Sequence, residues 1–344
     1  MEVAFCFYMA YFTMSLPISY LLNRIQYKKT LMLGISMILL GSIIFIIAMP
    51  TLKFETLLLA LFIFAIGVVT LDVTTNPFMA IIGPTTTAPA RLNLGHSFTL
   101  LSTIIIPIII ATSLSSHLSR IYIIIAMITL SALIFISMLD FSHIKMPEIS
   151  RINQKNNMLR QASFLFGLLA IFCYMGAEAS TAGLLINYLH LPQVMGFTLE
   201  KAAKYLSFFW GGIMLGRLVG SYIMTKINPA KLLMFAALSG IILIMITITS
   251  RGKIAMWSFL ALGLSDSIMF PTIFGLLTGK LSHQYLKNKA SGFFATAMVG
   301  GAFISLFQGK LADMIGLQHA FAGLIVCYLI IFYYAYRRIN YSHL

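Results

Sequence analysis

Long apolar runs separated by short polar loops follow one another along almost the whole chain. There are eleven such runs, at residues 3–22, 30–49, 56–83, 91–113, 119–139, 161–182, 202–225, 230–249, 254–278, 289–311 and 318–336. A helix that crosses a membrane needs about 20 mostly apolar residues. The runs are too long, and too uniformly apolar, for half-buried β-strands. The pattern therefore predicts an all-α membrane protein with eleven transmembrane helices.

Composition supports this prediction. Of the 344 residues 60% are hydrophobic and 9% are charged, and the mean hydropathy is +0.95. A soluble protein of this size needs far more charge to cover its surface. The three cysteines lie in separate apolar runs, which favours packing over a disulfide or a metal site. We expect no metal and no cofactor.

The net charge of +14 is explained by membrane topology. If the loops alternate sides and the loop at 23–29 is cytoplasmic, fifteen Lys and Arg residues are cytoplasmic and seven lie on the other side. This bias is the positive-inside rule, and it places the C-terminus in the cytoplasm. We therefore predict a multi-pass protein of the plasma (inner) membrane whose surroundings are the lipid bilayer, with no nucleic-acid partner.

An internal repeat divides the chain. The stretches "SYLLNRIQYKKTLM" (19–32) and "SYIMTKINPAKLLM" (221–234) align without gaps at an offset of 202 residues. Parallel repeats of six helices are typical of one large class of transporters. The run that starts near residue 161 has no counterpart in the first half, so we expect a twelve-helix design that lacks its first helix.

The same repeat predicts the domain boundaries. We expect an N-terminal half at 1–140, a polar cytoplasmic linker at 141–160 and a C-terminal six-helix half at 161–344. A second match, at an offset of 194, places an Asp five residues before a Pro in each half: Asp72 before Pro77 and Asp266 before Pro271.

Several stretches carry a family resemblance: "NRIQYKK", "LDVTTNPFMAIIGP" with "ARLNLGHSF", "YMGAEASTAGLLINYL", "AAKYLSFFWGGIMLGRLVGS", "SIMFPTIFGL" and "MVGGAFISLFQGKLAD". Together they resemble the fucose permease and glucose/galactose transporter family of the major facilitator superfamily. The resemblance covers essentially the whole chain. It implies the major facilitator fold and uptake of a monosaccharide driven by a cation, usually H⁺. It also implies a gating role for Arg24, Lys28 and Lys29 in the loop at 23–29.

Asp72 is an ionisable residue inside an apolar run, which is costly and normally indicates a cavity or a partner. Asn76 shares its helical face, and Pro77 leaves the carbonyl of Val73 without its helical donor. Carboxylate, amide and carbonyl suit sugar hydroxyls, which both donate and accept hydrogen bonds. We expect Asp72 and Asn76 to bind the sugar and Asp72 to carry the coupled proton. The alternative is a structural kink with a buried, protonated Asp.

Two further acidic residues lie in apolar runs of the second half. Asp266 repeats the geometry of Asp72, with Pro271 freeing the carbonyl of Ser267. Glu178 and Asn187 share at most a broad face of one helix, and the alternative for Glu178 is a hydrogen bond between helices. We expect Glu178 and Asp266 to be further proton-coupling candidates, and Glu178 and Asn187 to bind sugar.

Other polar and aromatic residues complete the predicted sugar site. His96 titrates near physiological pH, although a lone His is more often structural, and Trp210 could stack on a sugar ring. The substrate-binding set also includes Asn93, Thr99 and Gln308.

Near the same segment, Gly212, Gly216 and Gly220 form a stripe that favours close helix packing. Arg217 is expected to extend its side chain towards the inner membrane interface.

The sequence thus predicts a secondary active transporter that performs monosaccharide:H⁺ symport by alternating access. No nucleotide-binding signature is present, which argues against ATP as the energy source, and no hydrolase motif indicates an enzyme. The alternative is a truncated, non-transporting remnant or sensor derived from such a transporter. The sequence leaves open which sugar is bound, whether the ion is H⁺ or Na⁺, and the oligomeric state.

Overall fold

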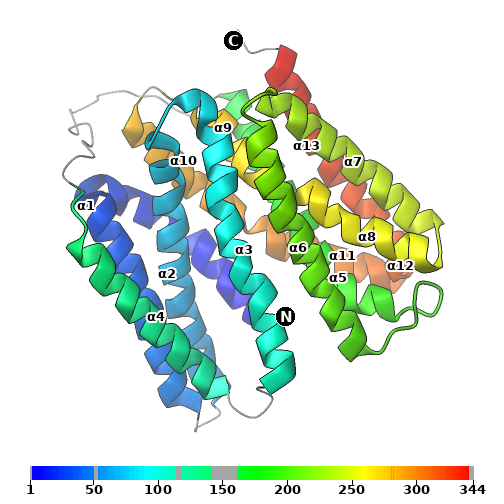
Figure 1. Ribbon diagram of the computed structural model, residues 1–344, viewed down its shortest axis with the longest axis horizontal. Coiled ribbons are helices and arrows are strands. Elements are labelled where there is room, and N and C mark those ends of the chain that lie inside the picture. The colour runs from blue at the N-terminus through cyan, green and yellow to red at the C-terminus, as the bar shows by residue number, and fades with distance from the viewer. Residues whose placement is uncertain are drawn as a thin grey trace. The chain divides into compact units, whose positions relative to one another are not determined.

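The computed structural model describes residues 2–49, 53–113, 118–141, 161–279, 281 and 283–340 (Figure 1). Within these residues all regular structure is helical, as the apolar runs predict. In chain order the elements are α1 (Glu2–Ala48), α2 (Phe54–Ile81), the 3-10 helix η2 (Thr85–Thr87), α3 (Ala88–Ser113), α4 (Leu118–Met138), α5 (Ala162–His190), α6 (Leu199–Ile223), α7 (Pro229–Thr249), α8 (Gly252–Asp266), α9 (Met269–Thr278), α10 (Gln284–Ala297), α11 (Gly300–Ile315), α12 (Leu317–Ala320) and α13 (Ala322–Asn340).

Nine stretches of the described residues are long and apolar enough to cross a membrane. The first, Phe5–Ala48, spans 44 residues and includes most of both predicted segments, at 3–22 and 30–49. Helices α8 and α9 together form another, Gly252–Thr278, and the predicted segment at 91–113 corresponds to α3. This architecture is that of a multi-pass membrane protein.

The predicted loop at 23–29 is reduced to a break at one residue. Gln26 has φ 68° and ψ 173°, a conformation that residues other than glycine rarely adopt. Its carbonyl accepts a hydrogen bond from Thr30 Oγ1 at 2.7 Å, which ties the break to the start of the next helical leg. The two legs of α1 run in opposite directions on either side of Gln26 (Figure 1).

The helices pack into two compact units that do not follow the chain in simple order. The first unit comprises the described parts of Met1–Phe78, Leu114–Asn157 and Lys280–Val299, and so contains α1, most of α2, α4 and α10. The second comprises the described parts of Met79–Ser113, Met158–Gly279 and Gly300–Leu344. The halves at 1–140 and 161–344 stay a prediction, and the linker at 141–160 lies, except for Phe141, outside the described residues.

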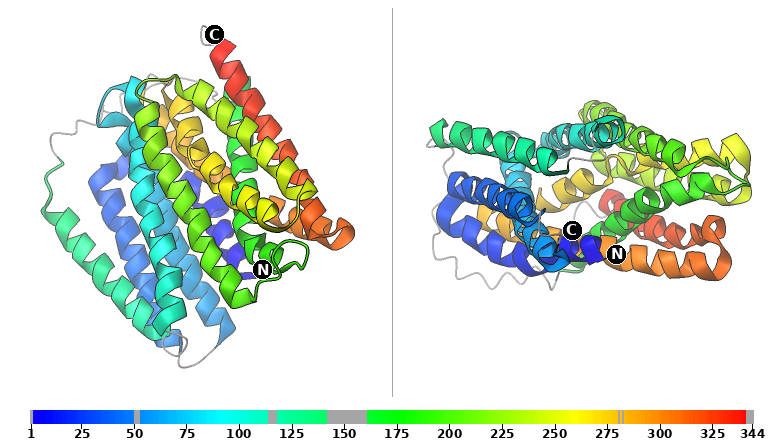
Figure 2. Two further views of the ribbon diagram at one scale, coloured as in Figure 1. Left: turned by 45° about the vertical axis from the view of Figure 1, so that its right-hand side comes forward. Right: turned by 90° about the horizontal axis from the view of Figure 1, so that it is seen from below.

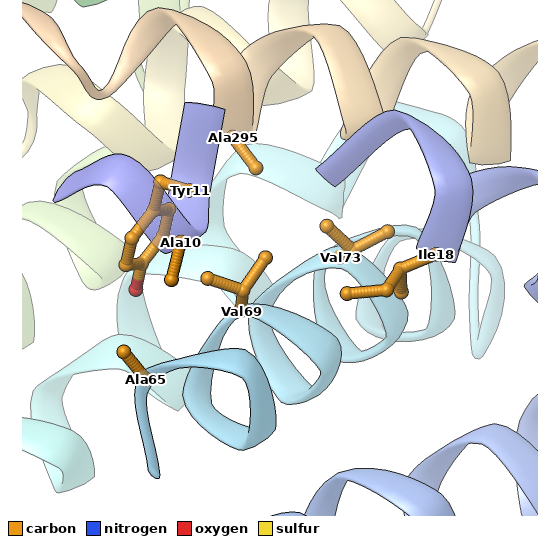
Figure 3. Close-up of a cluster of buried hydrophobic side chains, with 7 residues drawn as sticks. All are labelled: Ala10, Tyr11, Ile18, Ala65, Val69, Val73 and Ala295. Atoms are coloured by element: carbon orange, nitrogen blue, oxygen red, sulfur yellow. The ribbon is translucent and has the colours of Figure 1, made fainter. Parts of the chain in front are cut away.

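In the first unit, α1, α2 and α10 meet around a core of mostly small side chains (Figure 3). It consists of Ala10, Tyr11, Ile18, Ala65, Val69, Val73 and Ala295. Small residues allow helices to approach closely in a membrane. A Cβ atom on Gly292 of α10 would lie 2.5 Å from Ser19 Oγ of α1, so α10 can pack this closely only because residue 292 is glycine.

In the second unit, the glycine stripe of α6 packs against the junction of α8 and α9, as the sequence predicts. A Cβ atom on Gly216 would lie 2.3 Å from Ser267 Oγ, and one on Gly220 would lie 2.4 Å from Ile268 Cγ2. At Gly212 the nearest atom would be 3.7 Å away, an ordinary contact. Helices α7 and α13 run side by side on the same unit (Figures 1 and 2).

Candidate functional site

Asp72 of α2 has a partner that the sequence does not reveal. The hydroxyl of Tyr11, on α1, donates a hydrogen bond to Asp72 Oδ2 at 2.6 Å. Tyr11 is 3% exposed and Asp72 is half-buried. The ion pair found within the described residues involves Arg217 and Glu178, not Asp72. The described partner of Asp72 is therefore a neutral donor. Because no fixed cation among the described residues faces the carboxyl group, it can be either ionised or protonated.

The carbonyl of Val73, which Pro77 was expected to leave available for sugar, is already satisfied. Ser291 of α10 donates its hydroxyl to this oxygen at 2.9 Å. Val73 is fully buried, and Asn76 is 4% exposed on the same helix. Helix α2 continues through Pro77, and the carbonyl that Pro77 frees serves as a docking point for α10. The expectation of a bare carbonyl was wrong because a side chain from a distant helix fills the vacancy.

Arg217 of α6 is buried, and the expectation that it extends to the membrane interface is wrong. It is 6% exposed, and its Nε donates to the carbonyl of Ser267 at 2.8 Å. Ser267 is the residue whose carbonyl Pro271 deprives of a helical donor. One Nη atom also donates to the carbonyl of His96 at 3.2 Å. The guanidinium stays in the interior because it contacts the freed carbonyl of Ser267 and the carboxylate of Glu178.

Two carboxyl groups surround this one guanidinium. Glu178 Oε1 lies 3.9 Å from Arg217 Nη2 and accepts a hydrogen bond from Tyr174 at 2.5 Å. Asp266, which precedes Ser267, is fully buried and accepts a hydrogen bond on Oδ1 from Tyr328 at 2.5 Å. Within the described residues its Oδ2 has no partner. Two buried carboxyls with one cation can be electrically neutral only if one of them is protonated.

Two of the predicted sugar-binding residues lie on α3, and one of them, His96, contacts this cluster through its carbonyl. Asn93 is fully buried, and its amide donates to Thr272 Oγ1 at 3.3 Å, while its Oδ1 lacks a partner in the described part of the chain. The His96 ring packs edge-on against Phe270 at 5.5 Å. Thr99 lies on an exposed face, where its hydroxyl donates to the His96 carbonyl.

The remaining predicted sugar-binding residues are dispersed over the second unit. Asn187 is exposed on α5, and Trp210 of α6 is half-buried beside Phe209. Gln308 of α11 is 1% exposed, and its Nε2 is unpartnered within the described residues. A Cβ atom at Gly323 would lie 3.4 Å from Gln308 Oε1, so Gln308 lies against α13. No described contact joins these three residues to the Glu178–Arg217 pair.

Two of the three predicted gating residues, Arg24 and Lys28, have described hydrogen bonds. Arg24 donates to Tyr20 at 2.5 Å, and Lys28 donates to the carbonyls of Ser137 and Leu139 at the end of α4, both at 2.7 Å. Lys29 is exposed. Lys28 therefore caps α4, where the carbonyls that lack helical donors attract a cation.

Beside these charges lies a buried, uncharged network that sequence reasoning missed. Tyr27 donates to Asn288 Oδ1 at 2.8 Å, and Gln284 Nε2 donates to Tyr27 at 2.7 Å and to Asn288 Oδ1 at 2.9 Å. Asn288 in turn donates to Asn23 Oδ1 at 2.8 Å. We call Asn23, Tyr27, Gln284 and Asn288 the polar quartet. It joins the turn of α1 to α10 across 261 residues of sequence.

Arg91, in the "ARLN" stretch, has a structural task. Its guanidinium donates to the carbonyls of Met79, Ala80, Gly83 and Pro84, at distances between 2.8 and 3.2 Å. These carbonyls lie at the end of α2, where helical donors run out. Arg91 thereby closes α2 and fixes the start of α3, which carries Asn93 and His96.

The fold is that of a polytopic membrane protein with charges buried between its helices, and comparison with known proteins gives its family. The sequence model of the Major Facilitator Superfamily matches residues 2–306, so the chain belongs to this superfamily. It is 39% identical over 349 residues to a glucose/galactose transporter of Brucella abortus, covering 97% of this chain and 84% of that protein. The predicted family and the all-α membrane fold are confirmed.

A more distant relative and a solved structure agree with this membership. The chain is 25% identical over 364 residues to the L-fucose-proton symporter of Escherichia coli, covering 96% of this chain and 82% of that protein. A crystal structure of the E. coli fucose:proton symporter matches with a TM-score of 0.83 at 24% identity, over 98% of this chain and 90% of that one. The structural likeness supports the fold.

Proposed function

We propose that the chain is a secondary active transporter that moves a monosaccharide together with H⁺ across the plasma (inner) membrane by alternating access. The relative with 39% identity is described as a glucose/galactose transporter, and the one with 25% identity as an L-fucose-proton symporter. The higher identity favours a hexose of the glucose/galactose type. The names of these relatives also argue against an enzyme.

Coupling to H⁺ is supported above all by the pairing of Asp72 with Tyr11 at 2.6 Å. A carboxylate that faces a neutral phenol has no fixed cation to hold it ionised, so it can bind and release a proton during the cycle. Protonation turns an acceptor into a donor–acceptor group, which suits a sugar hydroxyl. Asp72 is thus our first candidate for the coupled proton, and Glu178 and Asp266 follow it.

Gating is supported by the polar quartet together with Arg24, Lys28 and Lys29. The positive-inside bias places the turn of α1 and the start of α10 on the cytoplasmic side. Each hydrogen bond of the quartet joins neutral groups, so it can open without separating charges. We propose that the quartet holds the cytoplasmic side closed and that its rupture accompanies inward opening.

Uptake by reconstituted protein tests the proposed function. The full chain in vesicles should accumulate labelled D-glucose or D-galactose, and L-fucose less, when the outside is made acidic, and a protonophore should abolish this accumulation. Accumulation that follows an imposed Na⁺ gradient and ignores the pH gradient would assign the coupling to Na⁺. Sugar binding without any uptake or exchange would favour the non-transporting alternative.

A further inference from the structure

A groove in the second unit is lined by none of the predicted sugar-binding, proton-coupling or gating residues. It runs between α6 and α7, which lie beside α8 in both views (Figures 1 and 2), and has a volume of about 510 Å³. That volume falls within the roughly 300–1,000 Å³ typical of small-molecule sites. Its walls carry large exposed apolar side chains: Leu215, Val219, Phe235 and Leu264.

Small residues create the groove, and its few hydroxyl groups are already satisfied. Gly216, Gly220 and Ala236 line it and leave space between the helices. Ser239 Oγ and Ser265 Oγ lie 2.8 Å apart and bond each other, while Ser267 donates its hydroxyl to the carbonyl of Leu264 at 2.6 Å. Since its polar atoms have partners, the groove suits a hydrocarbon occupant rather than a sugar.

One end of the groove is basic. Ile223 and Leu232 line this end, and two exposed lysines lie between them in sequence: Lys226 in the loop after α6 and Lys231 in the first turn of α7. Lys226 Nζ donates to the hydroxyl of Tyr222 at 2.7 Å, which holds the ammonium at the end of α6. No Asp or Glu occurs between residues 201 and 265, so no acidic neighbour in sequence competes for these lysines.

We propose that this groove binds an anionic phospholipid, with an acyl chain between α6 and α7 and the phosphate at Lys226 and Lys231. The walls belong to helices that cross the membrane, so hydrocarbon reaches them directly. Basic sites between transmembrane helices on the cytoplasmic side are suited to anionic headgroups. A zwitterionic lipid supplies the same chain and lacks the net charge, so the lysines give the site its selectivity.

The bound chain has a consequence for the buried charges. Ser267 and Ile268, which form part of the groove, are also the residues between α8 and α9. On the other side of this break, Arg217 holds the Ser267 carbonyl at 2.8 Å. An acyl chain in the groove therefore packs against the residues between α8 and α9 and stabilises the backbone to which Arg217 donates its hydrogen bond.

A fluorescence experiment on the full chain tests lipid selectivity. The natural tryptophans are removed (Trp210→Phe, Trp257→Phe), and a reporter is placed in the groove wall as Phe235→Trp, at a position 65% exposed. The protein is reconstituted in phosphatidylcholine discs that contain an equal fraction of either brominated phosphatidylglycerol or brominated phosphatidylcholine. We expect stronger quenching by brominated phosphatidylglycerol. Equal quenching by the two lipids would overturn the proposal and indicate ordinary boundary lipid.

Matched variants locate the site. Lys226→Gln with Lys231→Gln should reduce quenching by phosphatidylglycerol to the level of phosphatidylcholine, while Lys201→Gln with Lys204→Gln, at the opposite end of α6, should leave the difference intact. Thermal unfolding gives a second measurement: added phosphatidylglycerol should raise the midpoint of the parent protein and fail to raise that of the Lys226/Lys231 variant. If both double variants lose the preference equally, or neither does, Lys226 and Lys231 do not recognise the headgroup charge, and the proposal is overturned.

Discussion

Arg217 Nε lies 2.8 Å from the carbonyl oxygen of Ser267, the acceptor that Pro271 frees from the helix. The same solution occurs in the first unit, where Ser291 donates to the carbonyl of Val73 at 2.9 Å. Each carbonyl that a proline leaves without its helical donor therefore accepts a hydrogen bond from a side chain of another helix. At Val73 the donor is a neutral hydroxyl; at Ser267 it is a cation, which must also be neutralised within the apolar interior.

Substitution of Arg217 should be severely destabilising. Arg217→Gln removes the donor to two carbonyls and leaves Glu178 without its cation, and breaking a buried ion pair from one side costs about 3–5 kcal/mol. Arg217→Lys keeps the charge and loses the fork of donors, so it should rescue only part of the stability. The measurement is the thermal unfolding midpoint in detergent. The double variant Arg217→Gln/Glu178→Gln should be more stable than Arg217→Gln alone. If it is not, the pair is not coupled.

Asp266→Asn should preserve both stability and pH-driven uptake. Arg217 can neutralise only one of the two buried carboxyls, and Glu178, at 3.9 Å, is the one that it reaches. Asp266 is then the protonated partner, and Asn is a neutral residue of the same shape. Asp266→Leu is the variant for comparison. It leaves the buried Tyr328 hydroxyl without its acceptor and should destabilise the protein. Loss of accumulation in a well-folded Asp266→Asn variant would instead show that Asp266 exchanges the coupled proton.

The polar quartet yields a separate prediction. Tyr27→Phe removes the hydroxyl that donates to Asn288 and accepts from Gln284, so two hydrogen bonds of the quartet are lost at a cost of roughly 1–3 kcal/mol, while the bond between Gln284 and Asn288 remains. The thermal midpoint should fall, and a cysteine at position 19 should react faster with a cytoplasmic maleimide. Ser42→Ala, which removes a buried hydroxyl of α1 outside the proposed gate, is the matched control and should change labelling less. Equal labelling in both variants would argue against a gate at the quartet.

The apolar runs were sufficient to predict most helices, and the two prolines were sufficient to predict which carbonyls lack a helical donor, because each is a local property of the chain. They could not predict the partners. Tyr11 lies 61 residues from Asp72, and Tyr27 lies 261 residues from Asn288, so neither pairing leaves a local pattern. Arg217 was misplaced for the same reason: the rule for long basic side chains considers a helix alone, whereas the freed carbonyl of Ser267 comes from another helix.

Topology is a further prediction, since the side on which each loop lies rests on the charge bias alone. In a chain without its three natural cysteines, single cysteines should react from the cytoplasm when they replace Lys28, Lys226 or Lys287. Those that replace Lys53, Lys204 or Lys253 should react from outside. The measurement is labelling by an impermeant maleimide in intact cells and in inverted vesicles. A mixed pattern within one group would contradict the two-repeat topology.

Asp72→Asn should separate sugar movement from sugar accumulation. The amide keeps the shape of the protonated acid, and its NH₂ and carbonyl can still donate and accept, although it no longer titrates. Vesicles with this variant should therefore exchange labelled sugar for unlabelled sugar and fail to concentrate it when the outside is acidified. Asp72→Glu, which still titrates, should keep part of the accumulation. Tyr11→Phe tests the partner: it removes the 2.6 Å hydrogen bond and leaves the carboxyl, so accumulation should survive at a reduced rate. Should Asp72→Asn concentrate sugar under the pH gradient, the proton is carried elsewhere, and Glu178 becomes the next residue to substitute.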